Sequence, residues 1–268
     1  MKYAIEIKNL KKYFKIADER GKSIKRAVIN SLLFRNNYAY VKAVDGVSLN
    51  IKKGEFIGIT GRNGSGKSTL LKLIAGVMSQ DSGEISVNGK ISPFLELGAG
   101  FAKELTAMQN IYLYGAILGI HRDEIKQKAE KILEFADLHK FKNAKLGGFS
   151  SGMKSRLGFA TAMQVDADIF LVDEALAVGD IGFKKKCFDS FEKVKKSGKT
   201  IVFVSHHMDS LERFCDRLFL MEQGRIIAVG KPKKIIEQYK LQALQDKGGK
   251  IKAKEMRRRE IFNGECFP

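Results

Sequence analysis

One glycine-rich segment constrains the fold more than any other part of this sequence. It reads GRNGSGKS, residues 61–68, and lies between the apolar run EFIGIT and the run STLLKLIAG, which has helical periodicity. A strand, such a loop and a helix together direct backbone N–H groups toward one point at the helix N-terminus, where anions are stabilised. We therefore predict a phosphate-binding loop that follows a strand.

The residue types in this loop suit a nucleotide ligand. Glycines let the backbone close around phosphate oxygens, Lys67 supplies a positive charge for the β- and γ-phosphates, and Ser68 offers a hydroxyl to Mg²⁺. The residues predicted to contact nucleotide here are Gly61, Arg62, Asn63, Gly64, Ser65, Gly66, Lys67, Ser68 and Thr69. The alternative is a glycine-rich turn that binds no ligand.

Short β-rich runs alternate with helical patterns along the rest of the chain. The runs are YAIEI, VSLNI, EFIGITG, EISVNG, DIFLVDE, TIVFVSH, RLFLMEQG and RIIAVG, and helical patterns cover residues 68–78 and 123–136. This alternation predicts an α/β fold with parallel strands at the centre of a mixed sheet. The continuously apolar runs 169–172 and 201–204 are typical of strands covered on both faces.

The same patterns suggest how the chain is divided. We expect one nucleotide-binding domain at residues 1–240, with a helical subdomain at about 105–161 where strand signals vanish. An insertion is expected at about 16–42, containing an amphipathic stretch from Ser23 to Phe34. Residues 241–268 are expected to form a basic C-terminal tail.

Composition limits the classes of protein that fit. No stretch approaches the roughly 18 apolar residues that a membrane-spanning helix needs, and the N-terminus lacks an apolar signal-peptide core, so we expect a soluble cytoplasmic chain. The three cysteines are widely spaced, which argues against a disulfide framework or a zinc site.

The net charge is +18, and residues 1–53 carry 13 Lys and Arg against 4 Asp and Glu. This excess suits either a lysine-rich soluble surface or a polyanionic partner.

Two adjacent carboxylates end the buried run DIFLVDE, residues 168–174. They are predicted at the sheet edge where ligands of α/β folds bind. We expect Asp173 to belong to the Mg²⁺ shell and Glu174 to act as general base on the attacking water. Taken alone, such a pair also fits a capped strand end.

The pentapeptide FSSGM, residues 149–153, resembles the signature motif of ATP-binding cassettes, whose usual form is Leu-Ser-Gly-Gly-Gln. Ser150 and Gly152 match it, whereas Ser151 replaces a glycine and Met153 a glutamine. The resemblance implies that these four residues contact nucleotide.

Other segments resemble the same family in the same order. ALAVGD resembles its D-loop and VFVSHH its switch strand, which implies nucleotide contacts from Asp180 and a catalytic role for His206 near the γ-phosphate. Tyr13 stands where the family stacks an aromatic ring on adenine.

The family's Q-loop glutamine is missing from this sequence. The corresponding segment reads FLELGAGF and has Glu96 or Leu97 at that place. Glu96 is either a substitute metal ligand or part of a loop that only contacts a membrane partner.

The segments FLELGAGF, LTAMQNIYLYGAILG, FSSGMKSRLGFA and DEALAVGD resemble the ATPase subunits of bacterial polysaccharide exporters, those for O-antigen, teichoic acid and capsule. The resemblance covers roughly residues 1–240. It implies a P-loop NTPase fold of the ATP-binding-cassette type, with an N-terminal antiparallel β region and ATP hydrolysis with Mg²⁺.

The implied partners are a second copy, which completes an ATP-sandwich homodimer, and a pair of integral membrane permease subunits. Lipid-linked polysaccharide would be handled indirectly, at the cytoplasmic face of the cell membrane. The alternatives are a cassette ATPase that acts on nucleic acid or the ribosome, and an interaction protein with an inactive nucleotide site. Intact Lys67, Asp173, Glu174 and His206 oppose the latter, and no nucleic-acid partner is expected.

Overall fold

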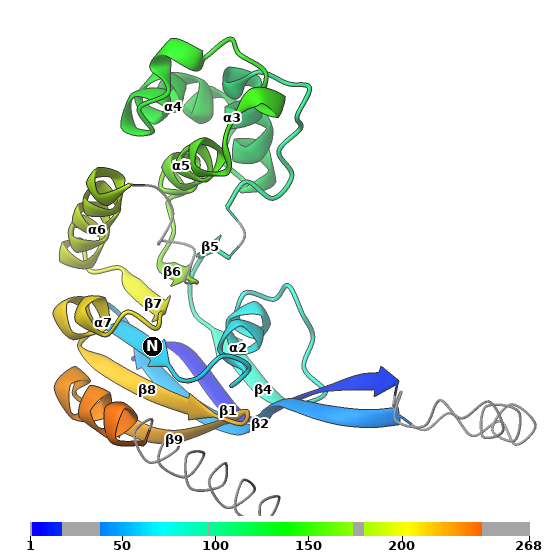
Figure 1. The fold of residues 1–268 in the computed structure, drawn as a ribbon, viewed down its shortest axis with the longest axis vertical. Helices are drawn as coiled ribbons and strands as arrows, with labels where there is room; N and C mark the ends of the chain where they lie inside the picture. The colour runs from blue at the N-terminus through cyan, green and yellow to red at the C-terminus, as the bar shows by residue number, and fades with distance from the viewer. Residues whose placement is uncertain (1, 18–37, 96, 174–179, 243–268) are drawn as a thin grey trace, which may run out of the picture.

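The computed structural model describes residues 2–17, 38–95, 97–173 and 180–242. They form two β-sheets and a group of helices at one end of the molecule (Figure 1). The strands are β1 (Tyr3–Ala17), β2 (Tyr38–Lys52), β3 (Phe56–Thr60), β4 (Ser82–Val87), β5 (Ile91–Phe94), β6 (Ile169–Val172), β7 (Thr200–Val204), β8 (Arg217–Glu222) and β9 (Arg225–Gly230). The helices are α2 (Lys67–Ile74), α3 (Ala107–Ile117), α4 (Arg122–Phe135), α5 (Ser151–Ala162), α6 (Ile181–Lys196) and α7 (Met208–Phe214), with short 3-10 turns η1 (His139–Phe141) and η2 (Leu146–Gly148). Residues 232–242 are also helical.

The larger sheet has the strand order β5-β6-β7-β3-β8-β9. Neighbouring strands are parallel except for β8 and β9, which pair antiparallel. Every residue of β3, β6 and β7 is buried, as continuous apolar runs predict for strands covered on both faces. The predicted mixed sheet is thus confirmed, and its order brings the carboxyl ends of β6, β7 and β3 side by side.

The smaller sheet is antiparallel, with the order β2-β1-β4, which confirms the expected N-terminal β region. Its strands β1 and β2 have 15 residues each, much longer than the short runs that the sequence suggested. Residues 16–17 and 38–42, at the two ends of the expected insertion, therefore belong to strands. The amphipathic stretch from Ser23 to Phe34 lies outside the described residues.

The helices α3, α4 and α5 lie between β5 and β6 in the chain and form the group at the top of Figure 1. Thr106 and Gln109 form a capping box that starts α3. The buried Asn110 side chain accepts a hydrogen bond from the Ala102 N–H at 2.8 Å and donates one to the Leu105 carbonyl at 3.1 Å. These bonds fix the chain that leads into α3.

Two elements differ from the sequence-based expectation. The strand β5 was not expected, because it contains Ser92 and Pro93, but it is an edge strand, where proline is tolerated. The helix α2 ends at Ile74 instead of near Met78. Gly76 has a φ of 70°, and the Val77 N–H donates to the Lys72 carbonyl at 3.1 Å, which closes the helix in a Schellman motif.

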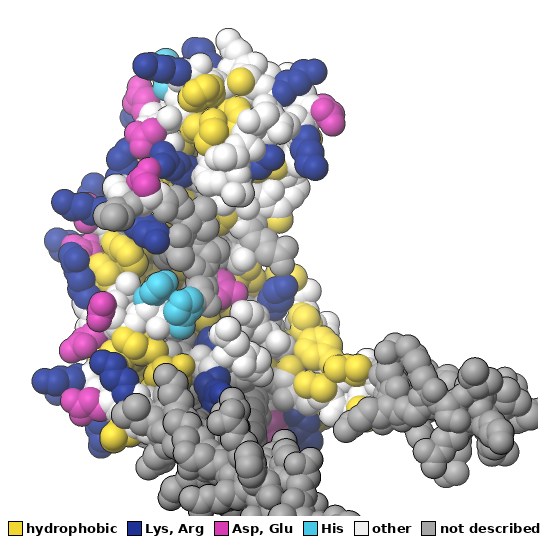
Figure 2. Space-filling model, in the orientation of Figure 1, with side chains coloured by type: hydrophobic (Ala, Val, Ile, Leu, Met, Phe, Trp, Pro, Cys, Tyr) yellow, Lys and Arg dark blue, Asp and Glu magenta, His cyan; other side chains and the backbone are white. Residues whose placement is uncertain are grey.

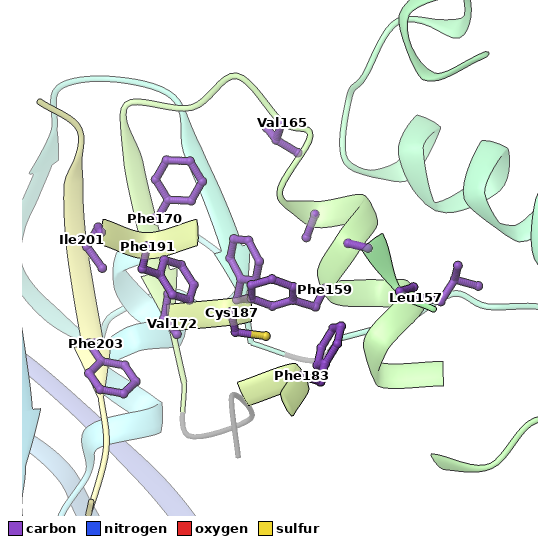
Figure 3. Close-up of a cluster of buried hydrophobic side chains, with 14 of the residues drawn as sticks. Leu157, Phe159, Val165, Phe170, Val172, Phe183, Cys187, Phe191, Ile201 and Phe203 are labelled. Carbon is purple, nitrogen blue, oxygen red and sulfur yellow. The ribbon is translucent and has the colours of Figure 1, made fainter. Parts of the chain in front are cut away.

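An aromatic cluster joins the helical group to the sheet (Figure 3). The ring of Phe159, on α5, lies with its centroid 5.5 Å from that of Phe94 on β5 and 5.7 Å from that of Phe191 on α6. It also contacts Phe183 and Phe135 at 5.9 and 6.0 Å. Phe159 therefore stands at the centre of the packing between three parts of the fold.

The cysteines form no disulfide within the described part of the chain. Cys187 and Cys215 are buried and free, whereas Cys266 lies outside the described residues. Burial raises the pKa of the Cys187 thiol to about 12, so the thiol stays protonated. No helix among the described residues is long and apolar enough to cross a bilayer.

We expect Phe159→Ala to lower the free energy of unfolding by about 3–5 kcal/mol, because it removes a fully buried ring from a packed cluster. Urea denaturation followed by circular dichroism measures this loss. Phe141→Ala is the matched control, since that ring is about half exposed, and it should cost less than about 1 kcal/mol. Equal losses in the two variants would contradict the central role of Phe159.

Candidate functional site

The predicted phosphate loop connects the end of β3 to the start of α2, as its sequence context requires. Gly61 and Gly66 have φ values of 147° and 103°, which disfavour residues with a side chain. A Cβ atom at Gly61 would lie 2.0 Å from the Met221 carbonyl oxygen, and one at Gly66 would lie 2.0 Å from the Ala43 carbonyl oxygen. The phosphate loop is therefore in close contact with the backbone of a strand from each sheet.

Lys67 and Ser65 turn their polar groups into this loop. The Lys67 ammonium donates hydrogen bonds to the carbonyl oxygens of Gly61 and Arg62 at 2.8 and 2.9 Å. Burial lowers the pKa of Lys67, while the negative charge of Asp173 opposes that shift. Ser65 is 4% exposed, and its hydroxyl is buried with no hydrogen-bond partner among the described residues. A cradle with a buried cation and an unpaired hydroxyl fits a phosphate group.

The carboxylate of Asp173 lies beside the start of α2. It follows β6 and accepts a hydrogen bond from the Ser68 side chain. Burial raises the pKa of Asp173, and the Ser68 hydrogen bond and the charges of Lys67 and Lys72 partly offset this. The structure therefore brings together Lys67, Ser68 and Asp173, as predicted. Glu174, the predicted general base, lies outside the described residues.

This arrangement can offer a metal ion one carboxylate and one hydroxyl. Among the described residues, no group of three or more His, Cys, Asp or Glu side chains could hold a metal ion. Mg²⁺ suits such a site, because it keeps several waters and takes further ligands from substrate phosphates. Glu96, the other predicted metal ligand, lies outside the described residues.

His206 follows β7, which is the neighbour of both β6 and β3. Its ring centroid lies 4.3 Å from that of His207. Partial burial lowers the pKa of His206, and the neighbouring His207 and Lys67 lower it further, so the ring is neutral at pH 7. Because β7 lies between β6 and β3 and is parallel to both, His206 is at the same sheet edge as Asp173 and the phosphate loop.

The signature residues lie at the N-terminus of α5, in the helical group. The Ser150 side chain caps the helix by accepting a hydrogen bond from the Met153 N–H at 3.2 Å, and Ser151 and Gly152 form its first turn. In Figure 1 this helix is well separated from α2, which follows the phosphate loop. Within one copy, the signature residues and the cradle thus belong to two separate surfaces.

Asp180 has both carboxylate oxygens occupied. One accepts a hydrogen bond from the Phe183 N–H at 2.9 Å and caps α6, and the other accepts one from the Arg156 guanidinium. These hydrogen bonds lower the pKa of Asp180, the Phe183 N–H having the larger effect. Arg156 also lies 3.8 Å from the Asp137 carboxylate and 5.1 Å from the centroid of the Phe183 ring.

Arg156 is a residue that sequence reasoning missed. It joins α5 to the first turn of α6, and hence the signature helix to Asp180. The sequence offers only an arginine a few residues after the signature, and its partner is 24 positions away. A nucleotide contact from Asp180 itself remains a prediction.

Tyr13 lies on β1 opposite Lys42 of β2. The next residue of β2, Ala43, has the carbonyl group that lies against Gly66 of the phosphate loop. Its N–H donates to the Asp81 carboxylate at 2.6 Å, and this bond is the main cause of a lowered pKa for Asp81. The backbone at Tyr13 is therefore held in place near the cradle. Stacking of its ring on adenine is untested by these contacts.

We expect Gly66→Ala to weaken ATP binding about tenfold to a hundredfold, because the new Cβ would collide with the Ala43 carbonyl and force the loop open. Titration with a fluorescent ATP analogue measures the affinity. Gly76→Ala is the matched control: Gly76 also has a positive φ, 70°, but nothing lies within 4 Å of the added Cβ. The cradle geometry is wrong if Gly66→Ala binds ATP as the wild type does.

Comparison with known proteins gives the family. The sequence matches the family model described as ABC transporter over residues 44–177. It is 41% identical over 245 residues to the O-antigen export system ATP-binding protein RfbB of Klebsiella pneumoniae, a match that covers 90% of this chain and 98% of that protein. It is 37% identical over 240 residues to the teichoic acids export ATP-binding protein TagH of Bacillus anthracis, covering 89% of this chain and 43% of that protein.

The fold is also similar to a solved structure, the ATP-binding cassette MJ0796 in a dimeric post-hydrolysis state bound to ADP and Pi. The TM-score is 0.69 at 25% sequence identity, and the match covers 85% of this chain and 98% of that chain. The phosphate cradle, the fold and the two sequence comparisons agree with one another. The chain belongs to the ABC transporter family, as an ATP-binding cassette that hydrolyses ATP.

Proposed function

We propose that this ATPase is the motor subunit of a transporter that exports a lipid-linked polysaccharide of the O-antigen, teichoic acid or capsule type. The observation that carries the proposal is the similarity to an O-antigen export ATP-binding protein over 98% of that protein's length. Similarity to a teichoic acids export protein points to the same class of substrate.

Hydrolysis transfers the γ-phosphoryl group of ATP to water, forming a P–O bond to the water oxygen and breaking the bond to ADP. The loop N–H groups and Lys67 bind the phosphates. Ser68 and Asp173 would hold Mg²⁺, which would supply positive charge to the phosphates. Asp173 must be ionised for this role, although burial raises its pKa.

Glu174 follows Asp173 directly and is the proposed general base for the attacking water. Neutral His206 donates a hydrogen bond to the γ-phosphate, which a ring with a lowered pKa can do without carrying charge. Glu96 is the proposed substitute for the missing Q-loop glutamine, and Tyr13 the proposed adenine platform.

The active unit is a homodimer that holds two ATP molecules between its subunits. The signature residues of one copy, Ser150 to Met153, close over the nucleotide in the cradle of the other. The separation of these two surfaces within one copy supports the arrangement. So does the dimeric state of the similar cassette bound to ADP and Pi.

A permease pair supplies the path across the membrane, and α3 offers a surface for it. Tyr112 and Ile117 are exposed, although α3 is apolar on nearly every side. A cavity of about 630 Å³ opens beside it between α3 and α4, lined by Tyr112, Leu113, Ala116, Ile120, Arg122, Asp123, Ile125 and Lys126. An apolar surface with a charged rim fits a cytoplasmic helix of a membrane partner. The ATPase would then lie at the cytoplasmic face of the cell membrane.

We expect Glu174→Gln to reduce ATP hydrolysis about 10²–10⁴-fold while ATP binding remains, because the general base is lost and the cradle is untouched. Phosphate release by the purified chain, alone and reconstituted with a candidate polysaccharide permease, measures this. Glu84→Gln is the control, since Glu84 is exposed on β4 away from the cradle. Wild-type activity in Glu174→Gln would leave the motor without its proposed base.

We expect Ile117→Asp to abolish the stimulation of ATP hydrolysis by the permease and to leave the unstimulated rate unchanged. A carboxylate on the apolar stripe of α3 would have to be desolvated at the interface. The comparison is made with Ile227→Asp, an exposed position on β9. If both variants are stimulated like the wild type, α3 is not the docking surface.

A further inference from the structure

The strands β1 and β2 continue well beyond the rest of their sheet. Strand β4 pairs with β1 only as far as the pair Lys11 and Ser82, whereas β1 and β2 remain paired as far as Ala17 and Tyr38. Figure 1 shows this two-stranded ribbon projecting from the body of the molecule. We define the ribbon as residues 12–17 and 38–44. A two-stranded ribbon is only marginally stable in water by itself, so a surface that supports it is expected.

Four apolar residues share one face toward the projecting end of the ribbon. Side chains alternate between faces along a strand, and register partners share a face. Phe14 pairs with Val41, and Ile16 with Ala39, so these four residues lie together. Phe14, Val41 and Ile16 are 37%, 47% and 50% exposed. The opposite face alternates aromatic and basic residues, Tyr13 opposite Lys42 and Lys15 opposite Tyr40, the last being 67% exposed.

The ribbon and its surroundings in the sequence are basic. Residues 12–17 and 38–44 contain Lys12, Lys15 and Lys42 and no Asp or Glu. The 20 residues that connect the two strands add five Lys and Arg against two Asp and Glu. Acidic partners occur at the base of the ribbon, where Lys12 contacts Asp81 at 2.9 Å and Lys42 lies 3.8 Å from Asp45. In the sequence, the ribbon and its connecting residues therefore have an excess of basic residues, next to exposed apolar side chains.

The ribbon and the proposed permease surface are both seen in one view of the molecule. Figure 2 shows hydrophobic side chains at several places in that view, among them the α3 and α4 region and the side from which the ribbon projects. Since a permease lies in the bilayer, the side that docks it is turned toward the membrane. This step rests on the proposed function.

We propose that the ribbon binds the surface of an anionic bilayer. Phe14, Ile16 and Val41, which share one face, enter the boundary between headgroups and acyl chains, and the basic residues of the ribbon and of its connecting segment attract anionic headgroups. Aliphatic, aromatic and basic side chains in one short element match the chemistry of that boundary, where apolar burial and attraction to anionic lipids add. A protein partner for the same ribbon would need a complementary apolar groove with acidic edges, and it is the competing outcome of the test.

The first test is cosedimentation of the full chain with vesicles of equal parts phosphatidylglycerol and phosphatidylcholine. The wild type should bind these vesicles and bind phosphatidylcholine vesicles weakly. The triple variant F14S, I16S and V41S should bind the anionic vesicles at least about tenfold more weakly. The control I227S and V229S removes two residues of similar exposure, 42% and 48%, from β9 and should bind like the wild type. Unchanged binding of the triple variant would overturn the proposal.

A second test does not depend on how well the triple variant folds. The chain contains no tryptophan, so Phe14→Trp places one reporter on the apolar face of the ribbon. Its emission should shift to shorter wavelength when the anionic vesicles are added, and that of Ile227→Trp should not. No shift at Phe14→Trp, or a shift that appears only when the permease is present, would assign the ribbon to a protein partner instead. Because vesicle binding requires no hydrolysis, its outcome is independent of the tests at Glu174 and Ile117.

Discussion

The close contact of the phosphate loop with backbone from both sheets is the constraint on which the rest of this structure depends. Gly66 faces the Ala43 carbonyl of β2, and Gly61 faces the Met221 carbonyl of β8, with no room for a side chain at either place. The same contact that shapes the anion cradle thereby joins the antiparallel sheet to the mixed sheet. It also fixes where the ribbon leaves the body, since Ala43 lies at its base. Binding of phosphate and the relative position of the two sheets therefore cannot be changed independently.

The helical group is joined to this core by chemistry of two kinds. Phe159 packs against rings from β5 and α6, which holds α5 to them but fixes the orientation of α5 only weakly. Arg156 fixes that orientation further, because its planar guanidinium contacts Asp180 and Asp137 with a defined geometry. As a result, α5 and the first turn of α6 are expected to move together. Any displacement of the signature residues would then reach Asp180 and the start of α6.

The sequence predicted well what depends on local pattern and poorly what depends on distant partners. The phosphate loop was evident because its glycines, lysine and serine stand between a strand and a helix, and α4 begins one residue from its predicted start. The strand β5 was missed because Pro93 obscures its pattern, and only pairing with β6 makes it a strand. The length of β1 and β2 was missed because each stabilises the other across a long interval. Arg156 was missed for the same reason, as was the packing of Ala43 on Gly66.

Electrostatic attraction favours binding of a negatively charged nucleotide between the two positively charged copies of the proposed dimer. Each copy has a net charge of +18, so two copies repel each other at long range. The cradle itself holds charges of both signs, because the Lys67 ammonium lies near the Asp173 carboxylate. In the proposed dimer, a triphosphate bound between the signature helix of one copy and the cradle of the other would supply negative charge between two positively charged copies, and the N-terminus of α5 would favour it. Hydrolysis divides that charge between two products that can leave separately. In the proposed dimer, bound nucleotide would therefore offset the repulsion between the two copies, and loss of its charge would favour opening.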